Sequence, residues 1–266
     1  MERRFYAIRL AYDGGRFRGF QRQRGLPTVQ EAVEGGLAVI GVRASLAVAA
    51  RTDAGVHALG QVVSFSARAD LDPDALRARL NATLPDGIVA LSARRVPGAF
   101  HARSSAVSRT YVYLVGAPPP EPLRPYAWTL PDPRAFPAVP EPRLDPDRIR
   151  EALSHAVGTH DFAGFARPGE QRGTVRTLLR AEVLSATWAP LHAIVLEGTG
   201  FLRAMVRNLV GTAVAAGLGV APPGDLDTLL RARGRYLGVR APGWGLTLAR
   251  VRYRPGATGE AGAEEA

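Results

Sequence analysis

The distribution of proline constrains this chain more than any other feature of its sequence. Eleven of its 21 prolines fall between Pro118 and Pro146. Proline fixes φ and lacks the amide donor that helices and central strands need, so we expect no packed helix or strand at this density. We therefore predict a linker or long insertion at residues 117–144, between an N-terminal half, 1–116, and a C-terminal half, 145–254.

Helices and strands are expected to alternate in both halves. The N-terminal half has expected strands at 5–12, 45–50, 61–67, 88–96 and 110–115, and helices after Thr28 and Asp72. The C-terminal half has expected helices from 145, 201 and 225, and strands at 175–186, 192–197 and 246–253. Glu31 follows Thr28 at the spacing of a capping box. Two halves of this order favour an α+β fold with mostly antiparallel sheets. Residues 255–266 are small and acidic and are expected to be disordered.

The side chains that the chain lacks exclude several kinds of chemistry. There is no cysteine, and all 34 basic residues are arginine. Disulfides, cysteine-ligated metals, Schiff bases and a P-loop lysine are therefore excluded. The 266 residues are 46% hydrophobic, with no apolar run long enough for a membrane span and no signal-peptide core at the start. We expect a cytoplasmic protein with one large domain or two smaller ones.

The net charge points to a polyanionic partner. The chain carries a formal charge of +10, and guanidinium groups match the geometry of phosphates. GC-rich coding, which replaces lysine by arginine, explains the missing lysine. It does not explain the excess of ten positive charges.

The densest group of polar residues lies at 50–58, between two expected strands. Arg51, Thr52, Asp53 and His57 surround Gly55 there, which is typical of a loop that presents side chains to a cleft. The alternative is a plain turn, in which Asp53 makes an Asx turn and Gly55 supplies a positive φ. Spacing alone favours the plain turn.

Two further segments combine arginine with aromatic or apolar residues. Arg103 and Arg109 precede a strand that carries Tyr111, which suits RNA, because guanidinium groups bind phosphates and rings stack on bases. An edge strand with a solvated basic face is the alternative. Arg203 and Arg207 lie four positions apart on an otherwise apolar helix. A buried arginine there requires a carboxylate partner, either structural or catalytic.

A glycine-rich segment after the first strand is strongly basic. It contains Arg16, Arg18, Arg22 and Arg24 within nine residues and is a candidate for a mobile loop that contacts RNA. A solvated basic hairpin is the alternative. His155 and His160 lack the spacing of a helical zinc site, so we expect no metal there and interpret residues 160–162 as the end of a helix.

Taken together, these segments resemble the tRNA pseudouridine synthases of the TruA type, which act on positions 38, 39 and 40 in the anticodon stem-loop. The resemblance is ordered and spans nearly the whole chain. The matching blocks are Tyr12-Asp13-Gly14 with Phe20-Gln21, 28–31, 51–57, 60–63, Leu80-Asn81 with Leu84-Pro85, 100–103 with Arg109 and Tyr111, 160–162, 175–177, 205–211 and Gly245-Leu246. So many blocks in family order are specific, and they favour a functional loop at Asp53 over a plain turn.

The resemblance implies an active site with three catalytic residues. These are Asp53 as the catalytic carboxylate, Tyr111 as the ring beside the target uracil, and Arg207 as the cation paired with Asp53. The expected substrate-binding residues are Arg51, Tyr111, Leu246, His57, Arg109, Arg16 and Arg18. The reaction moves uracil from an N1 to a C5 linkage, so no metal or other cofactor is expected. Three roles for the carboxylate fit it: attack on C1′, attack on C6, or removal of the C2′ proton.

The resemblance also implies an architecture and a set of partners. Two ferredoxin-like or RRM-like halves are expected to form a central basic cleft that binds the tRNA anticodon stem-loop after the target base flips out. The protein is expected to be a homodimer that does not bind a membrane. The first alternative function is a non-catalytic RNA-binding module on the same scaffold. A nucleosidase is a second alternative, but it would need another carboxylate as the acid.

Overall fold

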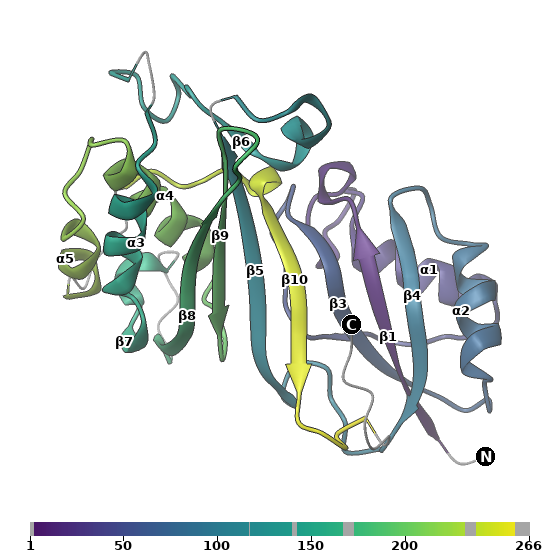
Figure 1. Cartoon of the computed structure of the whole chain (residues 1–266). Helices are drawn as coiled ribbons and strands as arrows, with labels where there is room; N and C mark the ends of the chain where they lie inside the picture. The colour runs from purple at the N-terminus through teal and green to yellow at the C-terminus, as the bar shows by residue number, and fades with distance from the viewer. Residues whose placement is uncertain (1–2, 117, 140–142, 167–172, 232–237, 259–266) are drawn as a thin grey trace. The chain divides into compact units, whose positions relative to one another are not determined.

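The computed structural model describes residues 3–116, 118–139, 143–166, 173–231 and 238–258. The chain forms two compact units, one of residues 1–109 with 248–266 and one of residues 110–247. It passes from the first unit to the second within strand β5 (Ala106–Gly116) and returns within strand β10 (Leu246–Tyr253). Both strands are labelled in Figure 1. Each unit is an α+β fold in its own right.

The first unit has the strand–helix–strand–strand–helix–strand order of a ferredoxin-like fold. Its elements are β1 (Arg4–Tyr12), the 3₁₀ turn η1 (Gly14–Arg16), α1 (Val29–Val39), β2 (Ala47–Val48), β3 (His57–Ala67), α2 (Pro73–Asn81) and β4 (Ile88–Val96). The sheet order is β4-β1-β3-β10, with β2 also on β3, and the β1–β3, β1–β4 and β2–β3 pairs are antiparallel. Helix α2 packs against β4 and lies beside α1 (Figure 1).

The core of the first unit follows the period of two that a half-buried strand requires. Tyr6, Ile8 and Leu10 of β1 are fully buried on one face of the sheet. Leu76 and Leu80 of α2 are four positions apart, and both are buried against the sheet side of the helix. The predicted mostly antiparallel α+β architecture is therefore confirmed in this unit.

The two N-terminal helices begin in different ways. Asp72 caps α2, because its carboxylate accepts a hydrogen bond from the amide of Ala75 at 2.8 Å. Thr28 also stands at a helix start, but its side chain makes no capping bond, and its Oγ1 is buried without a hydrogen-bond partner. The predicted capping box with Glu31 is therefore wrong. The Thr28 side chain is buried and leaves the amides of the first turn uncapped by its hydroxyl.

The second unit repeats the same element order. It begins with β5. The elements that follow are η2 (Glu121–Tyr126), β6 (Trp128–Thr129), α3 (Pro146–Ser154), β7 (Gly158–Asp161), η3 (Ala163–Phe165), β8 (Val175–Ser185), β9 (Leu191–Gly198), α4 (Met205–Gly217), α5 (Asp225–Arg231) and η4 (Gly243–Gly245). The sheet order is β5-β9-β8-β7, and β6 pairs in parallel with β5. The ladders β7–β8 and β8–β9 are antiparallel. The series β5, α3, β8, β9, α4 is again strand–helix–strand–strand–helix, and the next strand is β10, within which the chain returns to the first unit.

The proline-rich segment contains packed structure. Trp128, Leu130 and Phe136 are each at most 4% exposed. The Trp128 ring stacks on Phe136 at a centroid distance of 5.6 Å and meets Tyr113 edge-on at 6.3 Å. The prediction that no strand packs here is wrong. The two residues of β6 are not proline, and large apolar side chains between the prolines supply the buried surface.

The unit boundaries differ from those expected at residues 116 and 145. The second unit includes the segment 117–144, and the first unit ends at residue 109 before β10 rejoins it. At the C-terminus, residues 254–257 form a turn in which the amide of Ala257 donates to the carbonyl of Arg254 at 3.0 Å. The rest of the expected tail, 259–266, lies outside the described residues.

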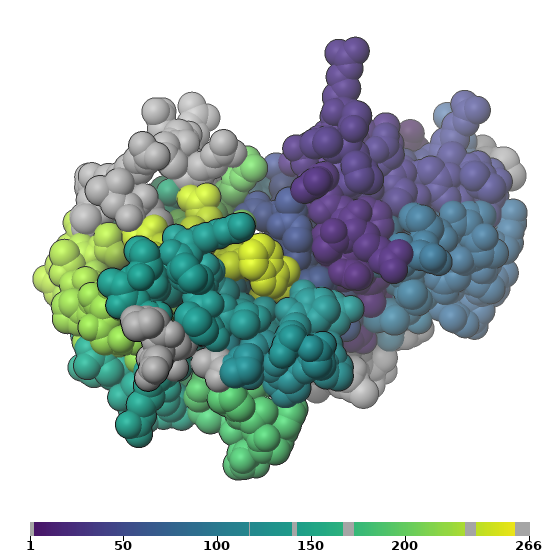
Figure 2. Space-filling view, turned by 90° about the horizontal axis from the view of Figure 1, so that it is seen from above, coloured from purple at the N-terminus to yellow at the C-terminus, as the bar shows by residue number. Residues whose placement is uncertain are grey.

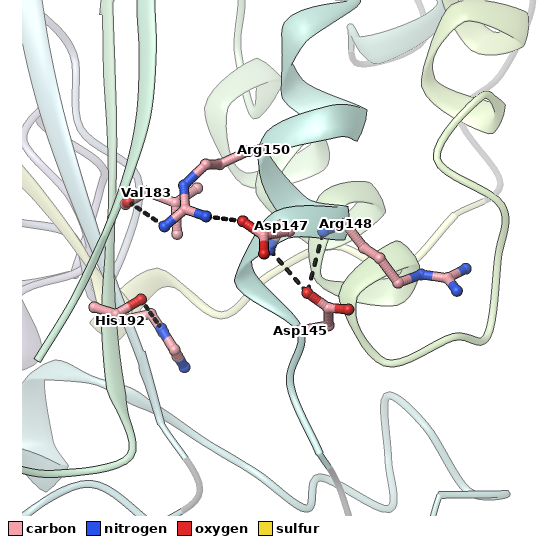
Figure 3. Close-up of polar contacts among 7 residues, drawn as sticks. Asp145, Asp147, Arg148, Arg150, Val183 and His192 are labelled. Carbon is pink, nitrogen blue, oxygen red and sulfur yellow. Dashed lines mark hydrogen bonds and ion pairs between the residues drawn. The ribbon is translucent and has the colours of Figure 1, made fainter. Parts of the chain in front are cut away.

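Polar contacts join the first helix of the second unit to its sheet (Figure 3). Asp145 caps α3 by accepting hydrogen bonds from the amides of Asp147 and Arg148. Arg150, one turn further along, pairs with Asp147 and also donates to the carbonyl of Val183 in β8 at 3.3 Å. These contacts fix the start of α3 over β8.

Candidate functional site

Asp53 lies in a short loop of the first unit, between β2 and β3, as the sequence predicts. Gly55 has a φ of +80° and turns the chain, and the amide of Val56 donates to the carbonyl of Asp53 at 3.2 Å. The Asp53 side chain is partly exposed, and Arg51 is exposed. We call residues 50–56 the Asp53 loop.

Buried side chains of β1 and β3 are hydrogen-bonded to the Asp53 loop. The Tyr12 hydroxyl and the Thr52 hydroxyl are hydrogen-bonded at 2.8 Å. The side-chain nitrogen of Gln61, Nε2, donates to the Tyr12 hydroxyl at 3.1 Å and to the carbonyl of Ala50 at 2.7 Å. Burial raises the pKa of Tyr12 to about 12, so its phenol stays uncharged at neutral pH. This uncharged, fully bonded cluster fixes the backbone on both sides of Arg51.

Two glycines of the segment after β1 pack against the Asp53 loop. A Cβ at Gly14 would lie 2.1 Å from the carbonyl oxygen of Val56. A Cβ at Gly19, whose φ is +95°, would lie 2.9 Å from the carbonyl oxygen of Thr52. The amide of Phe20 donates to that same oxygen at 3.0 Å. Only glycine permits this approach, so the loop is enclosed by backbone as well as by side chains.

The same segment presents its arginines to solvent. Arg16, Arg18, Arg22 and Arg24 are all exposed. Arg16 lies 3.7 Å from the carboxylate of Asp13, and Arg22 pairs with Glu34 at 2.9 Å. Figure 2 shows a purple projection from the N-terminal part of the chain at the surface of the first unit. We call residues 16–24 the basic segment.

His57 and Arg109 are buried beside the Asp53 loop, and their described bonds include main-chain groups. The amide of Gly14 donates to Nδ1 of His57 at 3.1 Å, and a carboxylate oxygen of Asp13 lies 3.2 Å from the same atom. The Arg109 guanidinium donates to the carbonyl of Ala49 at 3.0 and 3.3 Å. It also donates to two other carbonyls, Arg103 at 2.6 Å and Ala106 at 3.2 Å. Both side chains therefore stabilise local backbone.

The other expected site residues belong to the second unit. Tyr111, on β5, is 7% exposed and meets the ring of Phe201 edge-on at a centroid distance of 5.3 Å. Arg207, on α4, donates from Nε to the carbonyl of Ala241 at 2.7 Å. Leu246 is buried at the start of β10, directly after η4. Because Asp53 belongs to the first unit, its pairing with Arg207 stays a prediction.

Helix α4 begins at an unusual backbone conformation. Ala204, at the N-cap, has a φ of +63° and is the one non-glycine residue with positive φ among the described ranges. A left-handed conformation costs about 1–2 kcal/mol for a residue with a Cβ. Such strain is often found at functional sites. Here it lies three residues before Arg207.

The structure also bears on the sequence predictions about metals, membranes and His160. Within the described residues, no three His, Asp or Glu side chains lie close enough together to hold a metal ion. In that same part of the chain, no helix is long and apolar enough to cross a membrane. His160 lies in strand β7, opposite Arg176 of β8, so the prediction that residues 160–162 end a helix is wrong.

Sequence spacing alone does not identify several residues around the Asp53 loop and around Arg207. Tyr12 and Gln61 were part of the matching blocks but had no predicted role. Asn208 and Arg240, described below, had none either. For Tyr12, Gln61 and Asn208 the available signal was a polar group within an otherwise apolar strand or helix, since a buried polar side chain has to be hydrogen-bonded. Arg240 is exposed in a loop and carries no such signal.

Comparison with known proteins identifies the family. Residues 8–103 and 142–254 match the family model described as tRNA pseudouridine synthase. The chain therefore belongs to the tRNA pseudouridine synthases, a family of RNA-binding isomerases that modify tRNA. The predicted family and enzyme class are confirmed.

Two relatives that match this chain carry one name, tRNA pseudouridine synthase A. A tRNA pseudouridine synthase A from Streptococcus thermophilus is 38% identical over 254 residues, which cover 93% of this chain and 98% of that protein. A protein of the same name from Methylacidiphilum infernorum is 40% identical over 258 residues, with coverages of 94% and 96%. A chain in a solved structure described as an H/ACA RNP bound to a substrate RNA is 13% identical to this chain. The match covers 77% of this chain and 44% of that chain. Its TM-score is 0.34, too low to support an argument.

Proposed function

We propose that this chain converts uridine to pseudouridine in the anticodon stem-loop of tRNA, at positions 38, 39 and 40, with Asp53 as the essential carboxylate. One observation supports the role of Asp53 above others. The loop that carries it is fixed by Tyr12, Gln61 and the glycine contacts, while the Asp53 side chain keeps part of its surface in solvent. A preorganised backbone with an accessible side chain is what a catalytic carboxylate needs.

The reaction balances without an oxidant or a co-substrate. The bond between N1 and C1′ breaks, the uracil rotates, and a bond forms between C5 and C1′. C5 then loses its proton to a base, and N1 gains one. The carboxylate acts by attack on C1′, by attack on C6 or by removal of the C2′ proton. The product has the same atoms and the same oxidation state as the substrate.

The remaining site residues divide by the contacts that they make. In the second unit, Tyr111 packs beside the flipped base, Leu246 lines its pocket, and Arg207 pairs with Asp53. In the first unit, Arg51 and the exposed Arg16 and Arg18 bind phosphates, which offsets the cost of unstacking the base.

His57 and Arg109, which we expected to bind substrate, receive a different role in this proposal. Each is buried, and each bonds to the backbone near the Asp53 loop. We assign both to holding that loop.

We also propose a cytoplasmic homodimer in which the two units of each subunit form the basic cleft. Sedimentation should then give a mass of about twice 28.3 kDa.

Mapping pseudouridine in a tRNA transcript tests the proposal. After incubation with the protein, we expect pseudouridine at positions 38, 39 and 40 and no free uracil. Salt-dependent tRNA binding without any pseudouridine would favour a non-catalytic RNA-binding module. Free uracil or an abasic site would favour a nucleosidase. A product at other tRNA positions would contradict the proposed substrate site alone.

A further inference from the structure

Ala241, from a distant part of the chain, binds both the backbone and the side chain of Arg207. The amide of Ala241 donates to the carbonyl of Arg207 at 3.1 Å, and the carbonyl of Ala241 accepts from Nε of Arg207 at 2.7 Å. The backbone and the side chain of Arg207 are thus both bound to Ala241. An arginine has five N–H donors, and this contact uses the one on Nε. The four donors on the Nη atoms take no part in this contact.

The segment 239–242 reaches α4 because a glycine leaves room for it. A Cβ at Gly211 would lie 1.7 Å from the carbonyl oxygen of Val239, which no side chain can tolerate. At the other end of the segment, the Tyr113 hydroxyl donates to the carbonyl of Pro242 at 3.0 Å. Ala241, between them, is fully buried. The position of the Ala241 carbonyl is therefore set by packing on both sides.

A polar pair next to Arg207 completes this arrangement. Asn208 is fully buried, and its amide nitrogen donates to the carbonyl of Phe165 at 2.7 Å. Its amide oxygen accepts from Nε of Arg240 at 2.9 Å. Arg240 directly precedes Ala241 and is exposed. The pair therefore ties the residue before Ala241 to the residue after Arg207.

We propose that Asn208 and Arg240 are positioning residues, which hold Ala241 and through it set the guanidinium of Arg207. This inference rests on the proposed role of Arg207 in the isomerisation. An unrestrained arginine side chain samples many rotamers, and fixing Nε removes most of them. A misplacement of about 1 Å in a catalytic group can cost on the order of 100-fold in rate. An exposed arginine can instead bind RNA phosphate directly, so the experiment has to separate the two roles.

Two substitutions of Arg240 make that separation. Arg240→Met and Arg240→Gln remove the same charge. Glutamine places its Nε2 at the same number of bonds from Cα as Nε of arginine, so it can still donate to Asn208, whereas methionine cannot. Single-turnover rates at saturating tRNA and dissociation constants are measured for both. We expect Arg240→Met to lower the saturated rate about tenfold, within the range for a misplaced group. Arg240→Gln should restore most of that loss, with equal dissociation constants in the two variants.

A double-mutant cycle tests whether the effect passes through Arg207. Arg207→Lys removes the Nε donor, and in that background Arg240→Met should have little further effect on the rate. Equal rates for the methionine and glutamine variants of an active enzyme would overturn the inference. So would a methionine effect confined to the dissociation constant.

A spectroscopic measurement keeps the inference separate from the proposed activity. The ¹⁵N–¹H signal of Arg207 Nε, assigned by its loss in Arg207→Lys, should be protected from exchange in the wild type and in Arg240→Gln. It should exchange rapidly in Arg240→Met. Unchanged protection in Arg240→Met would contradict the positioning role even in a protein without activity, whereas an inactive wild type would contradict the proposed function alone.

Discussion

At the scale of single residues, Tyr12 bears most directly on the Asp53 loop. Its phenol is buried, uncharged and bonded to Thr52 and Gln61. Tyr12→Phe leaves both partners with an unmade bond, so we expect the free energy of unfolding to fall by about 1–2 kcal/mol. The saturated rate of pseudouridine formation should fall as well, because the loop backbone is less restrained. Urea denaturation and a single-turnover assay measure the two effects.

Tyr6 offers a matched control for that variant. It is also buried on β1, but its hydroxyl bonds to the backbone at Ala69 and Leu71, outside the Asp53 loop. Tyr6→Phe should cost similar stability and leave the saturated rate unchanged. Equal rate losses in the two variants would show that Tyr12 has no specific connection to the loop.

Ala204 gives a second prediction at this scale. Its left-handed conformation at the start of α4 costs about 1–2 kcal/mol, which glycine avoids, while glycine loses about 0.5–1 kcal/mol more entropy on folding. We therefore expect Ala204→Gly to raise the free energy of unfolding by up to about 1 kcal/mol. Ala78→Gly, at an exposed position inside α2, should lower it by about 1 kcal/mol. Urea denaturation distinguishes these outcomes, and a loss at both positions would contradict the strain at Ala204.

The residues of the Asp53 loop show which part of a site a sequence can predict. Arg51, Asp53 and His57 are neighbours in the sequence, so a polar loop between two strands could be predicted from them. Tyr12 lies 40 positions from Thr52 and 49 from Gln61, and its partners follow only from the antiparallel pairing of β1 with β3. Local spacing carries no information on contacts of that kind.

At the scale of elements, the basic segment is the main candidate for a contact with the RNA backbone. Arg16 and Arg18 are exposed there. Replacing both with glutamine should flatten the slope of log binding constant against log salt by about one to two units, because each lost phosphate contact releases one counterion fewer. Filter binding over a range of salt concentrations measures the slope.

A control for this variant has to match its change in charge. Arg43→Gln combined with Arg68→Gln removes two exposed arginines of the same unit outside the basic segment. We expect its slope to stay near that of the wild type. If both double variants flattened the slope equally, net charge and not the basic segment would account for the effect.

The sheet of the second unit contains a titrating group whose effect on stability has a definite sign. His192 of β9 is hydrogen-bonded to Ser185 at 2.9 Å, and burial, together with nearby Arg150, lowers its pKa from the usual 6.5 (Figure 3). Below about pH 6.5 the unfolded chain therefore binds more protons at this site than the folded one. The contribution of His192 to stability falls as the pH is lowered.

His192→Gln tests that sign. The glutamine side chain does not titrate, so the free energy of unfolding should decline less between pH 7 and pH 5 than in the wild type, with the two curves running parallel above pH 7. Urea denaturation at a series of pH values gives both curves. A steeper decline in the variant would mean that the pKa of His192 is raised in the folded state.

Two elements show where element-level prediction from sequence fails. Thr28 and Glu31 have the spacing of a capping box, but the hydroxyl of Thr28 is buried and makes no capping bond. The proline-rich segment places Trp128 in a short strand, because apolar side chains between prolines still gain from burial. In both cases tertiary packing overrides the local pattern. The capping of α2 by Asp72 could be predicted, because its cause is local.

At the scale of the whole molecule, the proposed function assigns roles to residues of both units. Asp53 belongs to one unit, and Tyr111, Arg207 and Leu246 belong to the other. The fold class and the family followed from the order of motifs along the chain, since that order is a property of the sequence. The assembly of the two sets of residues into one site is the part of the account that a reaction has to test.

The most direct test is the release of tritium from tRNA that carries 5-³H-uridine, since forming the bond at C5 expels that hydrogen. We predict release by the wild type and a loss of at least about 100-fold in Asp53→Asn, the scale expected for a catalytic proton-transfer group. Binding of tRNA should stay within about threefold, because the loop is held by other residues. Asp86→Asn, the same change at an exposed position of the first unit, should release tritium like the wild type. Release by Asp53→Asn at the wild-type rate would contradict the central role of this carboxylate.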